Sequence, residues 1–285
     1  MQLRRSPTVF RKNNMKKSLF ALFLLTALIP SYSQSREKRD LPSFDRISFR
    51  IPGKIFLKQG NTQSVEISAN PEQLKRIETR VEDGKLVIQL ENARDWRSRN
   101  DFDDVRIRIT VKQIKALHVT GSGHVRTDQP IRTDDLELDL AGSGSIMLQT
   151  ESGNLSADIA GSGNIELTGK ISGLDVDISG SGSVRVNSVS AGNITCEISG
   201  SGSLSAEGNA RDLKVTIAGS GSVNAYGLSV ASVRARIAGS GEVHVAATES
   251  IDAEIAGSGS VVYKGNPSKI NSHSSGSGKI RKSDD

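Results

Sequence analysis

Apolar and polar side chains alternate one for one along most of residues 131–264. Leu136, Leu138 and Leu140, for example, are separated by acidic residues, and the same alternation returns in each later stretch. Successive side chains of a β-strand point to opposite faces of the sheet, so this period of two predicts strands with one buried face. Residues 71–77 are the one segment expected to form a helical turn. The pattern therefore predicts an all-β protein.

The tripeptide Gly-Ser-Gly interrupts the alternation nine times, at intervals of 18 to 21 residues. Its copies begin at Gly121, Gly142, Gly161, Gly180, Gly200, Gly219, Gly239, Gly257 and Gly276. A fixed turn signal at such a period indicates stacked repeats. Each repeat holds two strands and two bends, so it returns the chain to its start, displaced by one strand spacing of about 4.8 Å. This predicts a parallel β-solenoid (β-helix) with rungs of about 19 residues, right-handed by the crossover rule.

The solenoid is expected to occupy residues 116–285, within a single domain that covers residues 34–285. Residues 41–115 are rich in predicted strands but lack the tripeptide. We expect this β-rich portion to cap the first rung, because an uncovered sheet edge invites pairing with other chains. A charged stretch at residues 92–104, which contains Trp96, is expected to be an exposed loop.

The N-terminal residues 1–33 are typical of a secretory signal peptide. Lys16 and Lys17 precede an apolar run at residues 19–29, and small residues lead up to Gln34, the expected start of the mature chain. Met15 is a more typical start than Met1, so residues 1–14 are interpreted as an extended gene call. The apolar run is too short to span a bilayer, and no transmembrane anchor is expected in the mature chain.

The net charge of +5 belongs to this leader. Residues 1–33 hold six basic and no acidic residues, so removing them from the total of 37 leaves 31 basic against 32 acidic residues. No basic face for nucleic acid is implied, and seven Phe, three Tyr and one Trp offer little for base stacking. The single cysteine, Cys196, cannot form an internal disulfide, and its inward parity predicts a small buried hydrophobic side chain.

Outward positions of successive rungs line up into a column of carboxylates. Its members are Asp139, Asp158, Asp177 and Glu197. Hard oxygen ligands about 4.8 Å apart suggest a Ca²⁺ site, or a surface for a cationic or polyhydroxylated ligand. The alternative is a solvated strand face that opposes aggregation. No other cofactor is expected.

An enzyme that acts on polysaccharides, a lyase or a hydrolase, is the alternative function for such a fold. It would need carboxylates or a metal together with a basic group in a groove. The four histidines His118, His124, His244 and His273 are interpreted as scattered, with no unique cluster. No base accompanies the serine column of the tripeptides, which is therefore interpreted as turn chemistry.

Several motifs resemble one bacterial family. They are Phe44-Asp45-Arg46-Ile47, Lys58-Gln59-Gly60, Asp83-Gly84-Lys85-Leu86, the Gly-Ser-Gly rungs and Gly265-Asn266-Pro267. Together they are similar to the auto-transporter adhesin family with a head GIN domain, over essentially all of the mature chain. The resemblance implies an exported β-helical protein of Gram-negative bacteria, with an adhesive role and no established catalytic residues.

The expected function is thus that of a non-catalytic, exported binding protein or adhesin. It would act in the periplasm, at the cell surface or outside the cell, with a glycan or a surface protein as its partner. A structural component of the envelope that binds another protein is a further alternative.

Overall fold

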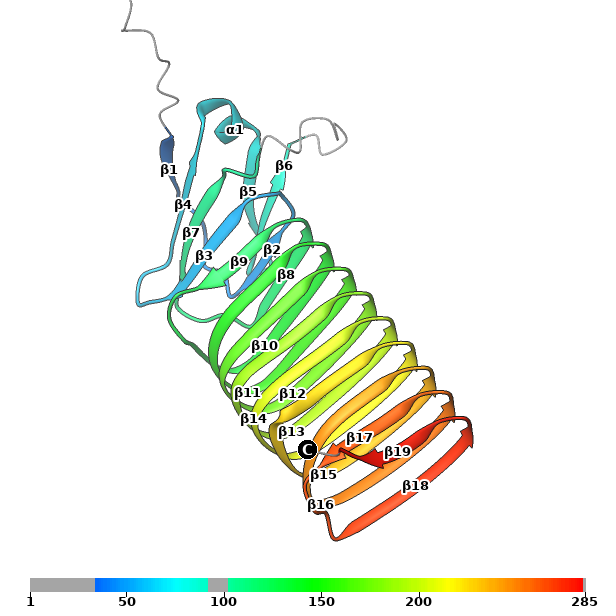
Figure 1. Ribbon diagram of the computed structural model, residues 1–285. Helices are drawn as coiled ribbons and strands as arrows, with labels where there is room; N and C mark the ends of the chain where they lie inside the picture. Colours follow the sequence, from blue (N-terminus) through cyan, green and yellow to red (C-terminus); the bar gives the residue numbers. More distant parts are fainter. Residues whose placement is uncertain (1–33, 92–101, 284–285) are drawn as a thin grey trace, which may run out of the picture. The chain divides into compact units, whose positions relative to one another are not determined.

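A computed structural model describes residues 34–91 and 102–283 of the chain. The predicted signal peptide at residues 1–33 lies outside the described residues. These residues form nineteen strands and one short helix, and Figure 1 shows the strands stacked as coils. None of the helices in the described ranges is long and apolar enough to cross a membrane.

The regular coils are built from strands that follow one another directly, and those from β10 to β16 are the longest. They are β8 (Ala116–Gly121), β9 (His124–Thr127), β10 (Ile131–Gly142), β11 (Ser145–Gly161), β12 (Asn164–Gly180), β13 (Ser183–Gly200), β14 (Ser203–Gly219), β15 (Ser222–Gly239), β16 (Glu242–Gly257), β17 (Ser260–Lys264), β18 (Lys269–Gly276) and β19 (Lys279–Lys282). From β10 to β16 each strand pairs in parallel with the next one along the chain. The predicted parallel β-solenoid, with about nine turns, is confirmed.

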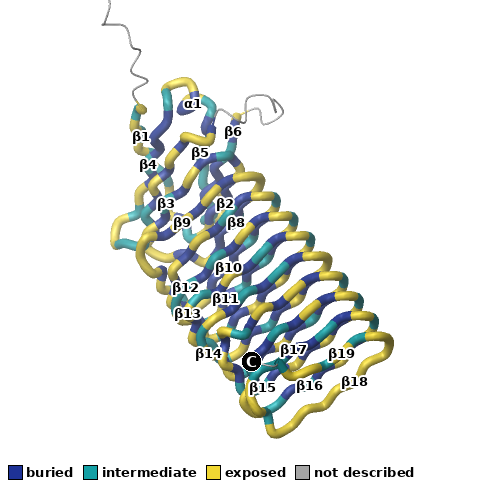
Figure 2. Tube along the Cα trace, viewed as in Figure 1, coloured by how far each residue is buried: buried dark blue, intermediate teal, exposed yellow. Residues whose placement is uncertain are grey.

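The inward columns expected from the sequence are buried along the solenoid. Leu138, Ala157 and Val176 are paired across neighbouring strands, and each is at most 2% exposed. A single hydrophobic cluster runs from the N-terminal strands to Val261, seen as the dark interior in Figure 2. In the last coil, by contrast, every residue of β18 is exposed. The solenoid therefore ends in a polar coil.

The corners explain why the tripeptide recurs. Gly180 has φ +124°, and a Cβ at that position would lie 2.5 Å from the carbonyl oxygen of Gly161 in the preceding coil. Gly182 is buried, and its Cβ would lie 2.5 Å from Cγ2 of Ile159. Ser181 points outward, while its backbone N–H donates to the carbonyl of Gly161 (2.9 Å). Both glycines are thus required by the close stacking of coils.

The N-terminal portion contains seven strands and the helix. They are β1 (Ser35–Arg39), β2 (Arg46–Phe49), β3 (Lys54–Gln59), β4 (Ser64–Ala69), α1 (Pro71–Arg76), β5 (Ile77–Glu82), β6 (Lys85–Leu90) and β7 (Arg106–Val111). Strands β2 and β3 continue the stack, because β2 pairs in parallel with both β6 and β8, and β3 with both β7 and β9. β5 then pairs antiparallel with β6, and β4 with β7. As expected, this portion covers the first regular coil.

The helix forms where the sequence suggested a helical turn. Asn70 caps it: its side chain accepts from the N–H of Gln73, whose side chain accepts from the N–H of Asn70. The expected exposed loop at residues 92–104 lies mostly outside the described residues. Where the description resumes, Phe102 is fully buried, with the Arg76 guanidinium 5.1 Å from its ring centroid. The expectation of exposure is therefore wrong at this position, because an aromatic ring closes the core beside α1.

Candidate functional site

The acidic column defined from the sequence lies in register on four successive strands. Asp139 on β10 is paired with Asp158 on β11, which is paired with Asp177 on β12, and Glu197 follows on β13. Asp139 and Asp158 are half-buried, whereas Asp177 and Glu197 are exposed. Parallel pairing therefore stacks four carboxylates on one outward face of the sheet.

The carboxylates are crowded at the N-terminal end of this column. Burial raises the pKa of Asp158 above its ordinary value, and the neighbouring carboxylates of Asp139, Asp177 and Glu137 raise it further. The hydroxyl of Ser156 donates to the Asp158 carboxylate (3.2 Å), which opposes part of this effect. Burial and neighbouring like charges thus both disfavour the charged form of Asp158.

Farther along the same face the charges are compensated. The Arg236 guanidinium lies 3.0 Å from the Glu254 carboxylate, and Arg234 lies 3.3 Å from Asp252. Glu197 lies 4.0 Å from the Lys214 ammonium. The unbalanced negative charge is therefore confined to the first coils.

His118 occupies the same column, one strand before Asp139, and its ring Nδ1 contacts the Asp139 carboxylate. Together with Glu137 these residues form the only group of three potential metal ligands found within residues 34–91 and 102–283, with ligand atoms within 4.8 Å of one another. The interpretation of the histidines as scattered is wrong for His118. Aligning Thr120-Gly121 with Ala141-Gly142 gives the signal that was missed, because it places His118 in the Asp139 column.

His124 and His244 lie away from this group and contact other neighbours. His124 lies 2.7 Å from the hydroxyl of Ser145 in the next coil. His244 lies 2.9 Å from the Glu242 carboxylate and edge-on to the ring of Tyr226, with 4.8 Å between ring centroids. The contact between His124 and Ser145 lies at the exposed surface.

Beside the acidic column, an open groove of about 940 Å³ lies between the N-terminal portion and the first regular coils. One side is formed by the end of β3 and the turn between β7 and β8, and the floor by the bends of β10 and β11. The lining residues are Gln59, Lys112, Gln113, Lys115, Arg132, Thr133, Asp134, Asp135, Leu136, Glu137, Glu151, Asn154, Leu155, Ser156, Asp158 and Asp175. Most carry a charge or a side-chain amide, so the groove offers many hydrogen-bond donors and acceptors.

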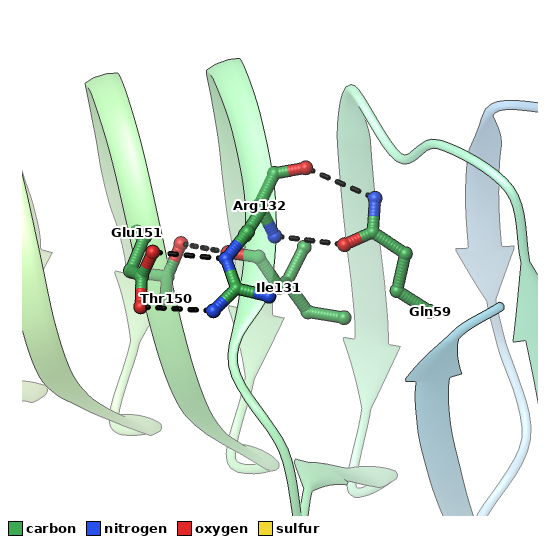
Figure 3. Close-up of polar contacts among 5 residues, drawn as sticks. All are labelled: Gln59, Ile131, Arg132, Thr150 and Glu151. Carbon is green, nitrogen blue, oxygen red and sulfur yellow. Dashed lines mark hydrogen bonds and ion pairs between the residues drawn. The ribbon is translucent and has the colours of Figure 1, made fainter.

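Polar contacts hold the wall of the groove in place, as Figure 3 shows. The Gln59 side chain bonds the backbone of Arg132 (2.9 and 3.0 Å) and the carbonyl of Lys112 (3.1 Å). The Arg132 guanidinium binds both carboxylate oxygens of Glu151 (2.9 and 3.3 Å), which lowers the pKa of Glu151. The buried hydroxyl of Thr150 donates to the carbonyl of Ile131 (3.1 Å). These contacts tie three coils together behind the groove.

A nucleophile is not provided by the one cysteine. Cys196 is fully buried in β13, and burial raises the pKa of its thiol to about 12. At neutral pH the thiol is therefore protonated and inaccessible, as its inward parity predicted.

The stacked parallel coils and their open polar face define a repetitive β-solenoid protein. The chain belongs to the family described as "Putative auto-transporter adhesin, head GIN domain", whose model matches residues 43–206 and 185–267. The resemblance noted from the sequence is confirmed. None of the curated proteins matches the chain.

Solved structures from Parabacteroides species share the fold. A putative adhesin from Parabacteroides distasonis ATCC 8503 is 22% identical with a TM-score of 0.68, covering 89% of this chain and 98% of its own. A putative adhesin from Parabacteroides merdae ATCC 43184 is 20% identical with a TM-score of 0.66, covering 89% and 97%. A putative lipid binding protein from Parabacteroides distasonis ATCC 8503 is 24% identical with a TM-score of 0.64, covering 89% and 98%. At these identities the likeness extends to the fold.

Proposed function

We propose that this protein is an exported, non-catalytic binding protein of the bacterial cell envelope that holds an extended polar ligand of the glycan class. The observation that carries the proposal is the open groove lined by Gln59, Arg132 and the bends of β10 and β11. Membership of an adhesin family supports a binding role.

The chemistry of the groove suits hydroxyl groups. Side-chain amides such as Asn154 both donate and accept hydrogen bonds, and the carboxylate of Asp135 accepts from hydroxyl groups. Asn154 donates to Asp135 (3.0 Å), which holds both side chains at the exposed surface. Because the groove follows successive coils, it fits a chain-like ligand better than a compact one.

Export is proposed on the basis of the leader at residues 1–33. Cleavage before Gln34 would leave β1, which begins at Ser35 and pairs with β4, intact. N-terminal sequencing of the protein recovered from the cell envelope should therefore begin at Gln34. A sequence that still contains Lys16 and Lys17 would contradict export by this route.

The binding proposal is tested by incubating the protein with a broad array of glycans and polysaccharides, scoring retention and product release together. Asn154→Ala should weaken retention, because it removes an amide from the groove. Asn193→Ala is the matched control: Asn193 stands at the same position two coils farther on, where it accepts from Arg211 (2.9 Å).

Retention of a glycan without product release supports a glycan-binding adhesin, provided that Asn154→Ala weakens the retention and Asn193→Ala does not. Release of unsaturated or hydrolysed products would replace it with the polysaccharide-acting enzyme. If no glycan is retained, the glycan proposal fails in favour of a protein partner, which a pull-down from envelope extracts would identify.

A further inference from the structure

One imidazole and two carboxylates meet on two adjacent strands at the start of the acidic column. His118 on β8 is paired directly with Asp139 on β10, and Glu137 lies two residues before Asp139 on the same face. We propose that His118, Glu137 and Asp139 bind a divalent transition-metal ion such as Zn²⁺. Glu137 also lines the groove, so the ion site adjoins the proposed glycan site, although ion binding itself requires no glycan.

The geometry places the ligand atoms within reach of one ion. One nitrogen or oxygen from each side chain lies within 4.8 Å of the other two. Ligand atoms around zinc lie about 3–4 Å apart, since each bond is about 2.0–2.2 Å long. Small rotations of these side chains would bring the ligand atoms from within 4.8 Å of one another to the separation of about 3–4 Å that zinc requires. The strands that carry them are held in register by parallel pairing, so the backbone need not move.

Unbalanced charge favours a cation at this place. In the described part of the chain, no lysine or arginine forms an ion pair with Glu137 or Asp139. The backbone carbonyl of Lys115 accepts from the Glu137 N–H (2.8 Å), but the Lys115 ammonium lies 2.7 Å from the Asp45 carboxylate. Asp158 on the next strand adds another carboxylate to the column. A bound divalent ion would neutralise part of this negative charge.

The donor set selects the kind of ion. Imidazole nitrogen suits zinc and its neighbours in the first transition row, whereas calcium takes oxygen ligands almost exclusively. His118 therefore distinguishes this end of the column from Asp158, Asp177 and Glu197, which offer oxygen alone. Three protein ligands at a solvent-facing position leave room for water in the remaining coordination positions.

The test is calorimetric titration of the purified protein with Zn²⁺ alone, repeated with Ca²⁺. We expect one Zn²⁺ per chain and at least tenfold weaker binding of Ca²⁺. Loading with Co²⁺ provides a second readout, since bound Co²⁺ absorbs visible light in a manner set by its ligands. Thermal unfolding without metal verifies that each variant is folded, as expected for exposed and half-exposed positions.

His118→Gln and Asp139→Asn should each weaken Zn²⁺ binding at least tenfold. His273→Gln is the matched control, because His273 is paired with Glu254 in the same column, but Glu254 is already bound by Arg236 (3.0 Å). Asp177→Asn tests a column carboxylate without a histidine neighbour. Neither control should change the affinity by more than about twofold.

The site is supported if His118→Gln and Asp139→Asn lose Zn²⁺ binding while the two control variants keep it. Absence of Zn²⁺ binding, equal affinity for Ca²⁺, or binding that persists in His118→Gln overturns it, and leaves the His118–Asp139 contact as an ion pair. Because the titration contains no glycan, failure here is distinct from failure of the proposed glycan binding.

Discussion

The side-chain amide of Gln59 pairs with the backbone of Arg132 in both directions. The Arg132 N–H donates to Oε1 of Gln59 (2.9 Å), and Nε2 of Gln59 donates to the Arg132 carbonyl (3.0 Å). The Gln59 side chain thus forms the two hydrogen bonds that a neighbouring peptide group forms elsewhere in the stack. This relationship joins the end of β3 to β10 across the groove.

Gln59→Glu should destabilise the protein by about 1 kcal/mol, because it removes one donor and sets a carboxylate against two carbonyl oxygens. The free energy of unfolding from urea titration measures the change. Gln113→Glu adds the same charge at an exposed position of the same groove and serves as the control. Equal effects of the two variants would show that charge alone, and not the Gln59 pairing, is responsible.

Alanine at the first glycine of a Gly-Ser-Gly corner should lower the free energy of unfolding for two separable reasons. Gly180→Ala adds strain at φ +124°, of about 1–3 kcal/mol, and an overlap with the carbonyl of Gly161 that costs about as much again. Gly121→Ala adds the strain alone, since φ is +96° and no atom lies within 4 Å of the new Cβ. Urea denaturation should therefore rank Gly180→Ala as clearly the less stable variant.

Asp158→Asn should stabilise the protein at neutral pH. The raised pKa means that the folded state holds the Asp158 proton more tightly than the unfolded state, so stability falls as pH rises from 3.8 to the folded pKa. Removing the charge recovers roughly 0.2–1 kcal/mol above that interval, a gain that solvent screening keeps small. Below pH 3.8 the variant and the parent protein should be equally stable.

The control for Asp158→Asn is a variant that should not gain stability. Asp252→Asn removes a carboxylate that lies 3.3 Å from Arg234, so it should leave stability unchanged or reduce it at neutral pH. Denaturation midpoints measured across the acidic range would contradict the interpretation if Asp158→Asn were destabilising at neutral pH.

Cys196 should not react with a water-soluble disulfide reagent until its coil opens. The thiol is buried between Val176 and Val215, and its pKa of about 12 leaves little thiolate near neutral pH. Ser201→Cys, at an exposed corner of the same repeat, should react at once. Prompt labelling of Cys196 in the parent protein would show that the middle of the solenoid opens readily.

The regular coils could be predicted from the sequence because their signal is local and repeated. Leu138 points inward and Asp139 outward by strand parity alone, and parallel register then follows from the period. His118 lies three residues before Gly121, as Asp139 lies three before Gly142, so the sequence records their shared column, but it does not record that the ring contacts the carboxylate. The groove could not be predicted from the sequence, for a different reason. Gln59, Lys112 and Arg132 are brought together by tertiary structure, and no spacing along the chain records that contact.

The place of β2 and β3 within the stack has a consequence for how the chain acquires its structure during synthesis. Ile47 on β2 is paired with Leu86 on one side and Leu117 on the other. Strands that are synthesised early therefore cannot complete their pairing until residues much later in the chain have been synthesised. Each coil after β10, by contrast, finds its template already in place as soon as its own residues appear. We therefore expect the N-terminal end to form slowly, and growth toward the C-terminus to proceed one coil at a time.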